Sequence, residues 1–295
     1  MLVIMSFVVG LVVLLYPFHL HLTRLQKELW NLSHVAGFAM LYVLVFTVYR
    51  LDHKYTNKKI IKYTLLSSIL LGIATESLQL LIPSRQFSAI DIGYDIIGAL
   101  LGVTLCLVLT RKVAFWMFLG IPLLVLIALL PSRHVIMDEI HMYQQFPILS
   151  DFSSKNELLR WHGKDLKRVC EIESDNCALS FNLTNAKYSG VTLIAVAPDW
   201  RDYTYLKIEI YARNSIKITL RVNDIAHTDS YKYEDRFNIH PLLDAGTNEL
   251  TIKLSDIKEA PQNRMMDLAN IDSLGVFSTQ PHTNDTMLIK SVRLF

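Results

Sequence analysis

Two patterns of hydrophobic and polar residues divide this chain near position 131. Before that position, long apolar runs alternate with short polar stretches, and a bilayer core needs roughly 17–25 apolar residues per helix. Five such runs predict five transmembrane helices, at residues 2–18, 33–50, 64–82, 92–109 and 113–130. We therefore expect residues 1–131 to form a multi-pass α-helical membrane domain.

After position 131, apolar and polar residues alternate in short runs bounded by turn residues, which is typical of strands with one buried and one wet face. No strand–helix–strand repeat appears, and this excludes a Rossmann domain. We expect a linker at 132–145 and an all-β jelly roll or β-sandwich over 146–295. The clearest predicted strands are Tyr205–Tyr211, Ile216–Val222, Asn248–Leu254, Ile271–Phe277 and Met287–Phe295.

The charges follow the same division. Of the 295 residues, 1–131 contain ten Lys and Arg and five Asp and Glu, and the remainder contain 19 and 22, so the formal charge changes from +5 to −3. Nothing in this distribution indicates nucleic-acid binding. The loops after the second and fourth runs carry seven Lys and Arg, against four on the opposite side. This bias predicts a cytoplasmic N-terminus and an extracytoplasmic C-terminal domain, in the cell (inner) membrane.

Two further features bear on this topology. The first apolar run has no basic segment before it and no small-residue cleavage site, so we expect an uncleaved anchor, with a signal peptide as the alternative. Cys170 and Cys177 lie in the half expected to face an oxidising compartment. A local disulfide between them is one interpretation, and two buried free thiols are the other.

Polar side chains occur at helical spacing inside the apolar runs. A carboxylate at membrane depth costs about 2.5–3.5 kcal/mol, so Glu76 should have a partner or a function. Asp91 and Asp95 are four residues apart and therefore share one face of the next helix. We expect a polar ligand-binding site near the outer leaflet, formed by His34, Glu76, Gln79, Arg85, Ser88, Asp91 and Asp95.

The spacing of these positions resembles a known family. The pattern comprises His34-x-x-x-Phe38, Glu76-x-x-Gln79, Pro83-x-Arg85-x-x-Ser88-x-x-Asp91 and Asp95-x-x-Gly98-Ala99-x-x-Gly102. It is similar to the VanZ-like membrane domain over about residues 15–110, although that family usually has Asn at the position of Asp95. The resemblance implies a multi-pass bacterial envelope protein. Low-level teicoplanin resistance is attached to the founding member, and no established reaction comes with the family.

Four roles stay open for this polar site, and one of them is a relay for proton-coupled transport. Glu76, Arg85 and Asp91 could form a salt-bridge cluster that only locks a helical hairpin. Arg85 and His34 could instead bind the phosphate of a membrane lipid headgroup or a lipid-linked glycan. In a membrane enzyme of phosphoryl or glycosyl transfer, Glu76 would act as base, or the carboxylates would hold a divalent cation. We favour a non-enzymatic role and assign no catalytic residue.

The C-terminal half also carries a resemblance. Asp199-Trp200-x-x-Tyr203, Tyr233-x-Asp235-Arg236-Phe237-Asn238, Ala245-Gly246-x-Asn248 and Arg264-x-x-Asp267 are similar to the galactose-binding-like jelly roll of carbohydrate-binding modules. The resemblance implies binding of an envelope polysaccharide by aromatic stacking, with core packing as the alternative role of each ring. It also makes a structural calcium conceivable, but no acidic spacing places one, and we expect no metal ligand or cofactor. The candidate glycan-binding residues are Trp161, Trp200, Tyr203 and Tyr231.

Overall fold

A computed structural model of the protein describes residues 23–51, 57–79, 89–110, 119–171, 176–197, 199–227, 232–279 and 285–295. The chain divides into two compact units, Met1–Arg133 and His134–Phe295. Each unit has its own clusters of buried hydrophobic residues. The division falls close to the point where the hydrophobic pattern changes.

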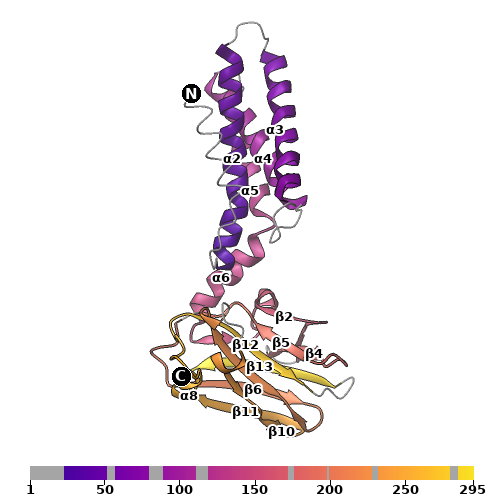
Figure 1. The fold of residues 1–295 in the computed structure, drawn as a ribbon. Helices are drawn as coiled ribbons and strands as arrows, with labels where there is room; N and C mark the ends of the chain where they lie inside the picture. Colours follow the sequence, from indigo (N-terminus) through magenta and orange to yellow (C-terminus); the bar gives the residue numbers. More distant parts are fainter. Residues whose placement is uncertain are drawn as a thin grey trace. The chain divides into compact units, whose positions relative to one another are not determined.

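The first unit is helical, as expected where backbone groups must find their hydrogen bonds within one apolar segment. Its described helices are α2 (Arg24–Leu51), α3 (Asn57–Gln79), α4 (Ala89–Leu109) and α5 (Gly120–Leu129), and α6 (Arg133–Gln145) begins at the boundary between the units (Figure 1). Within the described residues, α2 and α4 are long and apolar enough to cross a membrane, and counting α5 with α6 as one bent pair gives a third span. Candidate membrane helices are thus present, but five spans are not confirmed, and the run at 2–18 lies outside the described residues.

Glycines let α4 approach α2 closely. A methyl group on Gly98 would lie 2.5 Å from the carbonyl oxygen of Val35, and one on Gly102 would lie 2.6 Å from Cβ of Tyr42. These distances leave no room for a side chain at either position. Small residues commonly allow such close approach between membrane helices. Gly98 and Gly102 on α4 therefore face α2.

Helix α6 covers the segment that we expected to be a linker, and it is built into the second unit. Asp138 and Arg160 are both fully buried, with 3.0 Å between Oδ1 of the carboxylate and Nη2 of the guanidinium. Nε of Arg160 donates to both oxygens of Asp138 at 3.0 and 3.1 Å, and Nη1 donates to the Leu149 carbonyl at 2.9 Å. This network fixes α6 to the strands that follow it.

The described residues of the second unit form two large antiparallel sheets and one two-stranded sheet (Figure 1). Sheet A has the order β11-β6-β13-β4-β3, with β1 also paired to β13, and sheet B has the order β2-β5-β12-β8-β9. The strands of sheet A are β1 (Ile148–Ser150), β3 (Lys167–Cys170), β4 (Cys177–Asn182), β6 (Tyr205–Ala212), β11 (Gly246–Lys253) and β13 (Thr286–Leu294). Those of sheet B are β2 (Trp161–Gly163), β5 (Ser189–Leu193), β8 (Thr219–Asp224), β9 (Phe237–Ile239) and β12 (Ile271–Ser278).

Smaller elements connect these strands. They are the short strands β7 (Ile216–Lys217) and β10 (Leu242–Leu243), which pair with each other, the 3-10 helices η2 (Lys155–Arg160) and η3 (Tyr233–Asp235), and the helix α8 (Leu254–Glu259). The predicted strand Ile216–Val222 is therefore two strands, interrupted at Ile218, whose N–H donates to the carbonyl of Pro241 at 3.0 Å. This interruption passes the chain from the β7–β10 ribbon to sheet B.

A single buried cluster fills the space between the sheets, as the predicted period-two alternation requires. In β6, Leu206, Ile208 and Ile210 have no exposed surface, and the residues between them point outward. The β-sandwich expected for the C-terminal half is thus present. Cys170 and Cys177 are directly opposite each other in the β3–β4 pair and form a disulfide.

Candidate functional site

The first unit contains a buried polar pair on its two candidate spans. Nδ1 of His34 on α2 lies 3.0 Å from Oδ1 of Asp95 on α4, and both side chains are almost fully buried. The other carboxylate oxygen of Asp95 has no hydrogen-bond partner among the described residues. On α3, a methyl group at Gly72 would lie only 2.7 Å from this oxygen. The absence of a side chain at Gly72 therefore makes room for the Asp95 carboxylate.

The structure brings together only part of the predicted membrane site. His34 lies inside α2 rather than at its outer start, because the helix begins at Arg24. Asp91 is half-buried in the first turn of α4. The side chains of Glu76 and Gln79, and the residues 80–88 that include Arg85 and Ser88, lie outside the description.

Two of the four aromatic residues predicted to bind glycan are core residues. Trp200 has no exposed surface and donates from Nε1 to the Ala197 carbonyl at 2.8 Å. Trp161 is also buried and donates from Nε1 to Oγ of Ser150. Neither ring can stack on a sugar, because both of its faces are covered. Tyr203 is half-buried in an edge contact with Phe146, and Tyr231 lies outside the described residues.

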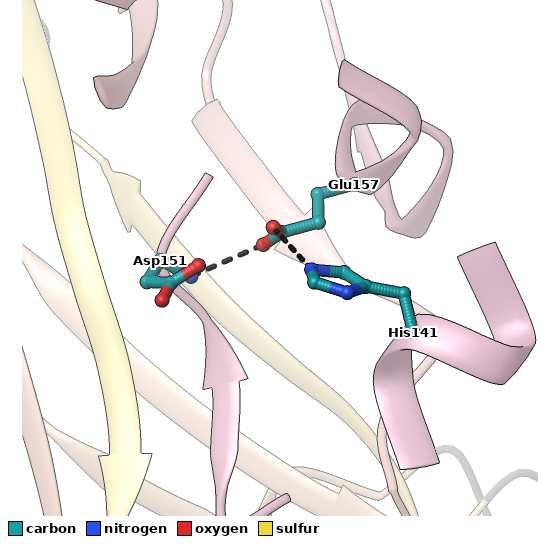
Figure 2. A group of neighbouring side chains, drawn as sticks. All are labelled: His141, Asp151 and Glu157. Carbon is teal, nitrogen blue, oxygen red and sulfur yellow. Dashed lines mark hydrogen bonds and ion pairs between the residues drawn. The ribbon is translucent and has the colours of Figure 1, made fainter. Parts of the chain in front are cut away.

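One group of side chains in the second unit has the composition of a cation site. Ligand atoms of His141, Asp151 and Glu157 lie within 4.8 Å of one another, and Figure 2 shows Glu157 between the other two. The Glu157 carboxylate already accepts five hydrogen bonds, including those from the backbone N–H groups of Asp151 and Ser154. A carboxylate offers about four lone-pair directions, so these donors occupy it. We assign Glu157 to the capping box of η2, with Ser154 as its N-cap.

A second network explains several positions of the jelly-roll motifs. Arg264 donates to the Asp224 carboxylate from Nη2 at 2.7 Å and to Asp235 from Nε at 2.6 Å. Burial opposes ionisation of Asp224, but the hydrogen bonds from Arg264 and from the backbone N–H groups of Asp267 and His227 hold its pKa below the ordinary value. These motif residues are structural.

The outer face of sheet A carries a pocket of about 450 Å³. Its lining includes the Cys170–Cys177 disulfide and the ion pair between Glu209 and Lys290, which are 3.3 Å apart. No aromatic residue lines it. The pocket could accept a small polar molecule, but it offers no ring on which a sugar could stack.

The outer face of sheet B, by contrast, presents aromatic rings to solvent. Tyr188 is 62% exposed and makes an edge contact with Phe277, with 6.0 Å between the ring centroids. The guanidinium of Arg221 lies 5.2 Å from the Phe277 centroid. Phe277 pairs with Gly190 on β5, whose lack of a side chain is required because a methyl group would collide with the Phe277 backbone.

Two more residues extend this surface across β9. Asn238 is directly opposite Arg221 in the ladder, and Arg236 lies two residues before it on the same face. We define the sheet B patch as Tyr188, Arg221, Arg236, Asn238 and Phe277. The sequence motifs include Arg236 and Asn238 without a binding role, and Tyr188, Arg221 and Phe277 were not predicted as site residues. The signal was present, however, since Arg221 and Phe277 occupy outward positions of predicted strands.

The helical unit, with its polar pair and its close glycine contacts, is the part of the chain that a known family matches. Residues 2–111 match the VanZ/LLP1 family. The predicted VanZ-like region is therefore confirmed, and it includes both His34 and Asp95. The match ends before α5, so the β unit lies outside it.

Solved structures similar to the chain include carbohydrate-binding modules, and the similarity lies in the β unit. The family 11 module from Clostridium thermocellum is 15% identical, with a TM-score of 0.37 over 50% of this chain and 94% of that one. An exo-beta-agarase is 16% identical, with a TM-score of 0.39 over 50% of this chain and 24% of that one. The family 30 module of a Clostridium thermocellum cellulase is 13% identical, with a TM-score of 0.34 over 46% of this chain and 86% of that one. No curated protein sequence matches the chain.

Proposed function

We propose that this chain is a membrane-anchored binding protein for a polysaccharide of the cell envelope, and that the sheet B patch holds the sugar. The observation that carries the proposal is the exposed ring of Tyr188 beside Phe277 and the Arg221 guanidinium. Sugars are bound by aromatic rings that cover their apolar faces and by polar side chains that contact their hydroxyls. The patch supplies both kinds of group on one side of a rigid sheet.

Other surfaces of the β unit fit this function less well. Trp161 and Trp200 are in the core, and the pocket on sheet A has no aromatic lining. Phe277 is held in position by the strand pairs on both sides of β12. A platform of this kind loses little conformational entropy when a ligand binds.

The test is polysaccharide binding by the full-length protein in lipid nanodiscs. Tyr188→Ala should weaken retention on isolated envelope polysaccharide about tenfold or more, since loss of a stacking ring removes a large share of the contact energy. Tyr143→Ala is the matched control, because Tyr143 is 61% exposed on α6, outside the patch. Equal binding by both variants and the wild type would refute the proposed surface. No retention of the wild type on any envelope polysaccharide would refute the function.

We further propose that the membrane unit is multi-pass, with a cytoplasmic N-terminus and the β unit outside. The Cys170–Cys177 disulfide supports this orientation, because disulfides persist in oxidising compartments. An alkaline phosphatase fused to the C-terminus should be active in cells, and a green fluorescent protein at the same position should be dark. The opposite result would contradict the orientation.

A second candidate function concerns the membrane unit and is favoured by the buried His34–Asp95 pair. A lipid-linked or amphipathic ligand with a polar headgroup would find a hydrogen-bond acceptor in the second oxygen of Asp95. Asp95→Asn should then reduce the lipids that co-purify with the protein, as measured by mass spectrometry, and alter teicoplanin susceptibility. Gly93→Ala is the control, because Gly93 has open space around it on the same helix. If Asp95→Asn lowers only thermal stability, the pair is a structural lock.

A further inference from the structure

The sheet B patch contains two arginines that have no carboxylate partner among the residues that the structure describes. The register of β8 and β9 places Arg221 opposite Asn238 on the outward face. Arg236 lies just before β9 in extended backbone, two residues from Asn238, and therefore faces the same side. Neither guanidinium forms an ion pair or a hydrogen bond with any residue that the structure describes, and Nε of each is buried. Oδ1 of Asn238, between them on the face, is also buried without a partner.

Three other arginines of the β unit have carboxylate partners. Arg160 is paired with Asp138, Arg264 with Asp224 and Asp235, and Arg201 with Asp199. A half-buried guanidinium normally finds such a partner, because charge removed from water is costly unless it is compensated. Neither Arg221 nor Arg236 has an ion pair among the described residues, and burial together with the charge of Arg236 lowers the pKa of Arg221.

Aromatic rings and a glycine hold the two guanidinium groups in place. Arg221 crosses β12 above Gly275, where a methyl group would lie 3.6 Å from Nε and Nη2, and it continues to the ring of Phe277. The guanidinium of Arg236 lies 5.3 Å from the centroid of Tyr233. These contacts fix the side chains without neutralising their charge, and they leave hydrogen-bond donors available.

We propose that the sheet B patch binds an acidic polysaccharide, with Arg221 and Arg236 contacting a carboxylate or sulfate group carried by the sugar. The inference rests on the proposed function and adds the chemical class of the ligand. An oxyanion accepts two parallel hydrogen bonds from a planar guanidinium and offsets the repulsion between two neighbouring positive charges. Tyr188 and Phe277 contact the sugar ring that bears the anionic group.

The experiment measures binding of the full-length protein in nanodiscs to three soluble polymers at 150 mM NaCl. These probes are polygalacturonate, which carries carboxylates, dextran sulfate, which carries sulfates, and neutral dextran. We expect at least one acidic polymer to bind and dextran not to bind. Arg221→Gln and Arg236→Gln should each weaken that binding by about tenfold or more, because each removes a charged hydrogen bond.

Two further variants make the result specific. Arg293→Gln removes the same charge from an exposed position on sheet A and should leave binding unchanged. Arg221→Lys keeps the charge but loses the bidentate geometry, so it should bind more weakly than the wild type and more tightly than Arg221→Gln. Tryptophan fluorescence of each variant confirms that the β unit is folded.

The outcomes separate this inference from the proposed function. If Arg293→Gln weakens binding as much as Arg221→Gln, the attraction is unspecific charge and the inference is wrong. If neutral and acidic polymers bind equally and only Tyr188→Ala weakens binding, polysaccharide binding is supported and the preference for an acidic polysaccharide is refuted. If neither these polymers nor envelope polysaccharide is bound, the proposed function itself fails.

Discussion

The buried ion pair between Asp138 and Arg160 allows a quantitative test of how α6 belongs to the β unit. Both side chains have 0% exposed surface, and three of the contacts of the guanidinium go to the Asp138 carboxylate. Asp138→Asn keeps the size of the side chain and removes its charge. Arg160 would then stay charged in a dry environment with no counter-ion, and loss of one partner of a buried pair costs about 3–5 kcal/mol.

That cost is a large share of the 5–15 kcal/mol by which domains are typically stable. Urea unfolding of the full chain in detergent measures it, because Trp161 and Trp200 are buried in the β unit and report its unfolding by fluorescence. We expect the midpoint to fall with an unchanged slope. Asp202→Asn, at an exposed position, should change the free energy of unfolding by less than about 0.5 kcal/mol.

A compensating double variant completes the test. Asp138→Leu combined with Arg160→Met removes both charges and fills the same space, so its stability should return close to that of the wild type. If Asp138→Asn itself unfolds within about 0.5 kcal/mol of the wild type, the pair is not buried in solution. Helix α6 would then be a linker, as its sequence first indicated.

Three other perturbations test separate parts of the molecule. Cys170→Ser opens a loop of sequence separation 7 and should lower the free energy of unfolding by about 2–3 kcal/mol; an unchanged urea midpoint would show that the disulfide is absent. Gly98→Leu should lower the melting temperature in detergent far more than Gly93→Leu, because only Gly98 touches α2, and equal shifts would contradict the helix packing. The lowered pKa of Asp224 stabilises the fold above about pH 4, and this stability is lost as the pH falls through that pKa. Arg264→Gln should therefore be less stable at pH 7 and lose less between pH 5 and 2; parallel pH curves would contradict this.

Local pattern was sufficient to predict most of the β unit. The predicted strands Tyr205–Tyr211 and Ile271–Phe277 agree with β6 and β12 to within one residue, because alternation with period two is a property of the segment itself. The structure of α6, in contrast, depends on a contact that is distant in the sequence. The segment 132–145 was expected to be a linker, and the partner that allows Asp138 to be buried in α6, Arg160, lies 22 positions away in the sequence.

The candidate sites could be predicted only in part, because the partners of their residues also depend on contacts between distant segments. Spacing along one helix placed Asp95 on a polar stripe, but that its partner would be His34 depends on how α2 packs against α4. In the β unit, Trp200 was a better glycan candidate than Tyr188 by residue type alone, yet the fold buries the first and exposes the second. The sequence marks Arg221 only as an outward residue of a strand, and the fold adds that it has no ion pair among the described residues. A half-buried arginine without an ion-pair partner can be identified only when the positions of the neighbouring strands are known, and the sequence does not give those positions.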